Sequence, residues 1–183
     1  MPTVARINVT PVKGLGLLHP EEVELTERGV ESNRRYYLIQ GWRLYNGKDH
    51  GQLVRTDEPG VGCDVHVGTL LGRASCERLG AELGAEVDGR RFRMLFELDG
   101  TGAHEEDTWE RVRIGEAIVR VAGPVPRCAV TTQDPDTGVR TLDTLAGIKS
   151  YRGLRDGKQL DFGVYFDVVE PGRVRVADAV VPL

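Results

Sequence analysis

The feature that most constrains the fold is a succession of short segments in which apolar and polar residues alternate. The clearest are ARINVT at 5–10, RFRMLFEL at 91–98 and FGVYFDVV at 162–169. Alternation with a period of two predicts half-buried β-strands. RVRIGEAIVRVAG at 111–123 repeats the pattern on both sides of Gly115, which predicts a hairpin. The 23 glycines are spread along the chain and suit many short strands joined by tight turns.

The rest of the chain adds more short strands and two short helices. Apolar residues recur at helical spacing in 74–83, where Gly84 supplies a stop, and in 141–152. Further strands are expected at 21–25, 34–40, 63–71, 128–132 and 174–181, hairpin residues at 41–56, a boundary loop at 57–62 and a polar loop at 99–110. The sum predicts a mainly β, barrel-like α+β fold with short helices.

One strand carries a more detailed expectation. In 91–98 the alternation places Phe92, Met94, Phe96 and Leu98 together on the inner face. Arg91 and Arg93 then fall on the polar face, where a sheet can simply present charge to water.

Composition excludes several classes of function. The net charge of −4 argues against nucleic-acid binding, so an anionic ligand would need a local basic cluster. No apolar run approaches the roughly 18 residues of a membrane span, and the N-terminus has no apolar signal region. The three cysteines are scattered, without metal-ligand spacing, which favours a reducing compartment. We therefore expect a cytoplasmic protein.

The sequence PVPRCAVTTQDPDTG at 124–138 contains the best candidate for chemistry. Cys128 follows two prolines and lies beside Arg127, whose permanent charge favours the reactive thiolate. From the residues alone, the alternative is a small buried residue that opens a strand. Cys63 and Cys76 are interpreted as structural.

Other polar residues are weaker candidates when each is considered alone. Lys13 lies in a loop, and Arg34 and Arg35 open an expected strand, where exposed or ion-paired arginines are common. The four histidines show no metal-ligand spacing. DPDTG at 134–138 has the composition of a tight turn.

The motifs taken in order resemble a known family. They are TPVKG, RRYYL, RRFRMLFE, EEDTWERVRIGEAIVRV, PRCAVTTQDPDTG, LAGIKSYRG and FGVYFDVVEPGRVRVADAV. The chain resembles MOSC domain proteins, which are related to the C-terminal part of molybdenum cofactor sulfurases, in the branch of the mitochondrial amidoxime-reducing component. The resemblance is nearly continuous from about Glu105 onward. It implies an abbreviated N-terminal barrel-like region at 1–60 and a MOSC domain at 61–183.

The resemblance also implies a cofactor and a site. The family's cofactor is a molybdenum-holding pterin dithiolene with a terminal phosphate, and Cys128 matches the cysteine that ligates molybdenum. The residues that match cofactor-gripping or site-lining positions are Lys13, Arg35, Arg93, Arg127 and Tyr165. The chain departs from the family at Met94-Leu95, where relatives often have Pro-Asn, and at Gly14, where some have serine.

The implied function is reduction of N-oxygenated compounds such as hydroxylamines, with electrons from a separate donor protein. No haem, flavin or iron–sulfur motif is visible in the chain. The alternative is a module that carries the cofactor, or a persulfide on Cys128, without turnover of its own. A third reading is a MOSC-fold protein that binds no metal.

Overall fold

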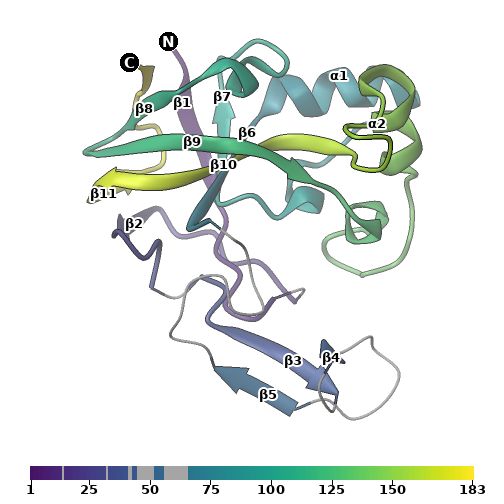
Figure 1. Cartoon of the computed structure of the whole chain (residues 1–183), viewed down its shortest axis with the longest axis horizontal. Helices are drawn as coiled ribbons and strands as arrows, with labels where there is room; N and C mark the ends of the chain where they lie inside the picture. The colour runs from purple at the N-terminus through teal and green to yellow at the C-terminus, as the bar shows by residue number, and fades with distance from the viewer. Residues whose placement is uncertain (14, 32, 41–42, 45–51, 56–65) are drawn as a thin grey trace.

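The structure is a computed structural model that describes residues 1–13, 15–31, 33–40, 43–44, 52–55 and 66–183. A curved seven-stranded sheet dominates it, and two helices pack beside the sheet (Figure 1). The strands of this sheet are β1 (Thr3–Ile7), β6 (Gly68–Gly72), β7 (Phe96–Asp99), β8 (Arg111–Ile114), β9 (Ala117–Pro126), β10 (Asp161–Glu170) and β12 (Val180–Pro182). The predicted hairpin is β8 and β9, which join through Gly115 at φ 56°.

The sheet order is β1-β7-β6-β10-β9-β8-β12, and only the β6–β7 pair is parallel. Its two edges approach each other, because Val4 N–H donates to the Asp178 carbonyl at 2.9 Å and Val180 N–H to the Pro2 carbonyl at 2.8 Å. The sheet is therefore a nearly closed barrel, which confirms the predicted mainly β, barrel-like fold with short helices.

Two smaller sheets accompany the barrel. One joins β2 (Glu22–Leu25) to β11 (Gly172–Arg175), and the other joins β3 (Tyr36–Gln40) to β4 (Arg43–Leu44) and β5 (Gln52–Arg55). The expected last strand, 174–181, is split between β11 and β12. The boundary loop at 57–62 and Cys63 lie outside the described residues.

The buried apolar residues form two clusters. One fills the barrel, and the predicted inward residues Val164 and Phe166 of β10 belong to it. The other lies between the sheet and the helices α1 (Arg73–Leu83) and α2 (Thr144–Arg152), and includes Phe162. Both helices were predicted, and α1 ends as expected at Gly84, with φ 64°. No helix among the described residues is long and apolar enough to cross a membrane.

The strand predicted at 91–98 is wrong over its first half. Residues Gly89–Phe92 form a 3-10 helix, η1, and Arg93 follows it in left-handed backbone at φ 52°. The Asp88 carboxylate accepts the backbone N–H of Arg90 at 2.9 Å and so begins η1. β7 begins only at Phe96. The alternation is misleading because Met94 and Leu95 are both buried.

The strand predicted at 128–132 is also wrong. β9 continues through both prolines to Pro126, and Ala129–Thr132 form a second 3-10 helix, η3. The hydroxyls of Thr131 and Thr132 donate to the carbonyls three residues earlier, at 3.1 and 2.7 Å. Such local bonds offer the backbone an alternative to strand pairing. A third 3-10 helix, η2 (Glu105–Thr108), lies in the predicted polar loop at 99–110.

Candidate functional site

Cys128 lies two residues beyond the end of β9, where the chain turns into η3. The residue is exposed, and its backbone carbonyl accepts the Thr131 N–H at 3.2 Å. An exposed thiol at a strand end can meet a ligand or a metal. The interpretation of Cys128 as a buried residue that opens a strand is therefore wrong.

Arg127, the neighbour of Cys128, points its guanidinium toward the protein. Nε donates to the Phe162 carbonyl at 2.7 Å and Nη1 to the Phe92 carbonyl at 3.1 Å, while Nη2 contacts Met94 Sδ. The guanidinium carbon also lies 5.4 Å from the centre of the Phe92 ring. Arg127 thus ties the end of β9 to β10 and to η1, and it fixes a positive charge one residue from Cys128.

Arg90 makes a second tie between η1 and the segment that carries Cys128. Its two terminal nitrogens donate to the two Asp136 carboxylate oxygens at 2.8 and 2.9 Å, and Nε donates to Asp88 at 2.8 Å. Hydrogen bonds from Arg90 to the Asp88 and Asp136 carboxylates hold the pKa of Arg90 above its ordinary value. The DPDTG turn at 134–138 is therefore clamped to η1 by a two-pronged ion pair.

Arg91 makes a third tie, from a buried position. Only 8% of the residue is exposed, so its expected place on a polar strand face is wrong. The 3-10 backbone turns the side chain inward, where Nη2 donates to Thr141 Oγ1 at 2.7 Å and Nη1 to the Thr132 carbonyl at 3.3 Å. Three arginines thus join 88–93 to 127–141.

Arg93, which directly follows η1, belongs to a basic cluster with Arg34. It donates to the Leu15 carbonyl, and its own carbonyl accepts Nη2 of Arg34 at 2.8 Å. The Lys13 backbone N–H donates to the Tyr36 carbonyl at 2.8 Å, which places Lys13 beside the start of β3. Burial and the neighbouring Arg34 charge lower the pKa of Arg93. The structure therefore contains a local basic cluster of the kind that an anionic ligand requires.

Arg35 does not point toward this cluster. Its Nε donates to the Glu31 carbonyl at 2.7 Å, and a terminal nitrogen lies 3.4 Å from the Arg28 carbonyl. The neighbouring residue, Arg34, occupies the place beside Arg93. The family resemblance assigns a cofactor-gripping position to Arg35, whereas Arg34 is the residue that contacts Arg93.

Tyr165 lies half-buried on β10, against the apolar cluster that includes Phe162 and Met94. Its ring centre is 5.2 Å from that of His66. His66 Nδ1 lies 3.0 Å from a carboxylate oxygen of Asp167, two residues along β10. Histidine spacing along the chain gave no sign of this pair, because 101 residues separate its members.

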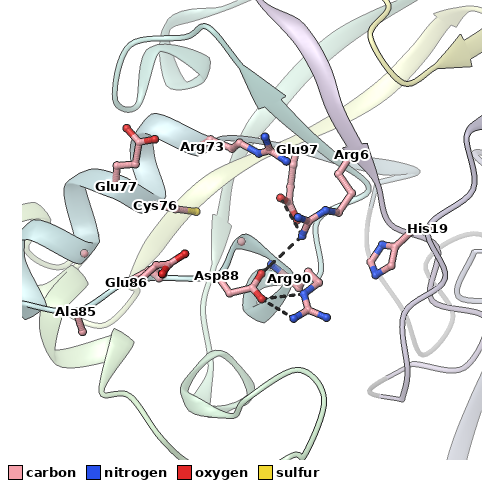
Figure 2. A pocket seen from close by; sticks show the side chains of 13 residues that line it. Arg6, His19, Arg73, Cys76, Glu77, Ala85, Glu86, Asp88, Arg90 and Glu97 are labelled. Atoms are coloured by element: carbon pink, nitrogen blue, oxygen red, sulfur yellow. Dashed lines mark hydrogen bonds and ion pairs between the residues drawn. The ribbon is translucent and has the colours of Figure 1, made fainter.

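The second described cysteine has very different surroundings. Cys76 faces inward from α1 with 5% of its surface exposed, and burial raises the pKa of its thiol strongly. It forms part of the wall of a cavity of about 910 Å³, where Arg6 lies near Glu97 and Asp88 (Figure 2). Cys128 does not line this cavity. Burial agrees with the structural interpretation of Cys76.

The described residues include no group of three or more histidine, cysteine, aspartate or glutamate side chains arranged to hold a metal ion. Within this part of the chain, Cys128 offers a single exposed thiol as a ligand.

Comparisons with known proteins agree with this picture. The mitochondrial amidoxime-reducing component 1 of Mus musculus is 36% identical over 159 residues, covering 82% of this chain and 46% of the relative. The molybdenum cofactor sulfurase of Oryza sativa subsp. japonica is 31% identical over 130 residues, covering 68% of this chain and 15% of the relative. The chain thus spans about half the length, or less, of these two relatives.

A solved structure and a family model complete the comparison. The YUAD protein from Bacillus subtilis has the same fold, with a TM-score of 0.60 at 12% identity, over 98% of this chain and 94% of that protein. The model of the MOSC domain matches residues 50–181, which include Arg90, Arg93, Cys128 and Tyr165. The chain belongs to the MOSC domain family.

Proposed function

We propose that this protein binds the molybdenum cofactor through Cys128 and reduces N-oxygenated compounds. The observation that carries the proposal is the exposed Cys128 thiol, held by arginine ties to the same η1 turn that leads into Arg93. A candidate metal ligand and a candidate anion site are therefore fixed relative to each other. The names of the relatives, amidoxime-reducing components and a molybdenum cofactor sulfurase, support the choice of cofactor and substrate class.

The residues present fit such a cofactor. A thiolate is a soft ligand that suits a sulfur-bound metal. A guanidinium can bond two oxygens of a phosphate at once. Arg93 has no carboxylate within ion-pair distance among the described residues, so its charge is available to an anion.

In this proposal the protein binds and orients the reacting groups. A hydroxylamine R–NH–OH would take up two electrons and two protons and give R–NH2 and water. When bound, the cofactor supplies the two-electron chemistry, and a separate donor protein replaces the electrons. Cys128 holds the metal, Arg93 and Lys13 bind the anionic part, and Tyr165 forms part of the wall. Arg127 holds the end of β9, next to Cys128, against β10 and η1.

The direct test is the metal content of protein purified from a host that makes the cofactor. We expect close to one molybdenum per chain by mass spectrometry, and at least a tenfold loss in Cys128→Ser. Cys76→Ala is the matched control and should keep its metal, because Cys76 is buried. Wild-type protein without molybdenum under these conditions would contradict the proposal.

The exposed position of Cys128 also suits the second candidate, a carrier of the cofactor or of a persulfide sulfur. Reduction of a model hydroxylamine with an artificial electron donor separates the two functions. Turnover that Cys128→Ser abolishes supports the reductase. Metal or persulfide on Cys128 without turnover supports the carrier.

A further inference from the structure

Two arginines from distant parts of the sequence share an unusual backbone conformation and meet in space. Arg34 has φ 54° and Arg93 has φ 52°, and Arg34 Nη2 donates to the Arg93 carbonyl at 2.8 Å. Residues other than glycine rarely adopt such angles, and asparagine and aspartate do so more readily than arginine. Conformations of this kind persist only where the surroundings impose them, and they gather at ligand sites.

The surroundings hold both residues firmly. Arg34 N–H donates to the Thr10 carbonyl at 2.7 Å, in the stretch where segment 10–13 runs beside the start of β3. Arg93 N–H donates to the Arg90 carbonyl at the end of η1, and its guanidinium donates to the Leu15 carbonyl. The two positive charges are therefore brought together by the backbone.

This arrangement leaves positive charge without a matching negative group on the Arg93 side. No carboxylate among the described residues lies within ion-pair distance of Arg93, while burial and the Arg34 charge both disfavour its charged form. An oxyanion bound between the two guanidinium groups would relieve this repulsion, and the planar guanidinium fork suits the oxygens of phosphate.

We propose that Arg34 and Arg93 form the phosphate-binding pair of this protein, and that Arg34 takes the role that family resemblance assigns to Arg35. The inference rests on the proposed function, because it supposes an anionic cofactor with a terminal phosphate. It differs from the family expectation at one residue. The Arg35 guanidinium points to the Glu31 carbonyl, whereas that of Arg34 points to Arg93.

The test compares two adjacent arginines in protein from a host that lacks the cofactor. Arg34→Asn and Arg35→Asn remove the same side chain, and asparagine tolerates the left-handed backbone at position 34. The probe is inorganic phosphate, with chloride at equal ionic strength as the control, and the readout is the phosphate dependence of the melting temperature. We expect wild type and Arg35→Asn to bind phosphate alike, and Arg34→Asn and Arg93→Gln to bind it at least about tenfold more weakly.

Arg34→Lys tests whether weaker phosphate binding comes from the loss of the guanidinium group and not from any substitution at this position. It keeps the charge but loses the fork, so its phosphate affinity should fall between those of wild type and Arg34→Asn. Urea unfolding without phosphate shows whether each variant folds. The proposal is overturned if wild type binds no phosphate, if Arg34→Asn binds like wild type, or if Arg35→Asn loses binding.

A second arm distinguishes the source of the phosphate and separates this inference from the proposed function. Protein from a cofactor-competent host is assayed for bound pterin by fluorescence after oxidative release. Pterin that falls in Arg34→Asn but not in Arg35→Asn identifies the cofactor as the ligand. If wild type holds no pterin while phosphate binding still depends on Arg34, the proposed function fails and the pair remains a site for free phosphate.

Discussion

The surroundings of Cys76 and Cys128 use some of the same residues in opposite ways. Around Cys76, Phe92, Met94 and Phe162 form part of an apolar cluster, and burial raises the pKa of the Cys76 thiol. Around Cys128, two of these residues offer their backbone carbonyls to Arg127, and the thiol stays exposed. The comparison teaches that the same residues can serve two purposes. The side chains of Phe92 and Phe162 pack in the apolar cluster and give stability, which we call the apolar side. Their backbone carbonyls accept hydrogen bonds from Arg127 beside the exposed Cys128, which we call the hydrogen-bonding side.

The largest expected difference between the two regions is in thiol reactivity. In a Cys63→Ser background, iodoacetamide should alkylate Cys128 about a thousandfold faster than Cys76, because Cys76 reacts only when its region opens. Peptide mass spectrometry over time measures both rates in one sample. Similar rates would contradict the comparison, and full reaction of both thiols in urea is the control.

The next largest effect should come from the hydrogen-bonding side. Arg127→Met should lower the free energy of unfolding by about 3 kcal/mol, because the carbonyls of Phe92 and Phe162 lose a charged donor. Urea unfolding provides the measurement. Arg120→Met is the matched control: the Arg120 side chain is 65% exposed, so its loss should cost less than about 0.5 kcal/mol.

The apolar side should respond to pH through His104. Its ring packs on Phe162 and Nε2 lies 3.0 Å from the Tyr151 hydroxyl, while burial and then the nearby Arg152 charge lower the pKa of His104 from 6.5 to about 4. The folded state therefore favours neutral His104. The resulting stability is present above pH 6.5 and is lost as the pH falls toward 4.

We expect wild type to lose about 1–2 kcal/mol more stability than His104→Gln between pH 7 and pH 4.5, after allowance for partial exposure. Urea unfolding at the two pH values gives this difference. Burial raises the pKa of Glu106 and has the opposite sign, but both proteins contain Glu106, so its effect cancels. Equal losses in the two proteins would rule out His104 as the sensor.

The smallest effect should be the coupling between Arg90 and Asp136. Asp136 is largely exposed, so a double-mutant cycle of Arg90→Gln and Asp136→Asn should give about 0.5 kcal/mol in unfolding. The single variants should nevertheless change the Cys128 alkylation rate about threefold, because the clamp holds the loop that carries it. Alkylation unchanged in both variants would show that the turn does not position Cys128.

Much of the fold could be predicted from the sequence, because strand alternation, helical spacing and glycine turns are local signals. The β8–β9 hairpin, both helices and the inward residues of β10 follow directly from them. The two wrong strands share a cause. In 91–98 and 128–132, the Asp88 carboxylate accepts a backbone hydrogen bond and the Thr131 and Thr132 hydroxyls donate to backbone carbonyls, which favours tight 3-10 turns over extended backbone. The pattern of apolar residues in the sequence does not reveal these hydrogen bonds between side chains and backbone.

The candidate site was less predictable for a different reason. Cys128 is recognisable because its immediate neighbours are unusual, and the structure shows that it is exposed. The roles of Arg34, Arg90 and Arg91 depend on which way each backbone turns, and adjacent arginines look alike in a sequence. The sequence missed these three residues, although positive φ values and distant partners identify them at once in the structure.

The three ties from Arg90, Arg91 and Arg127 have a consequence for the order of assembly. Every bond in them joins one part of the polypeptide to another, so the loop around Cys128 acquires its shape during folding. A ligand that binds after folding meets a preformed site and need not order the chain itself. This removes a large entropic cost of association. The folded protein would thus present an already ordered loop to the cofactor proposed above.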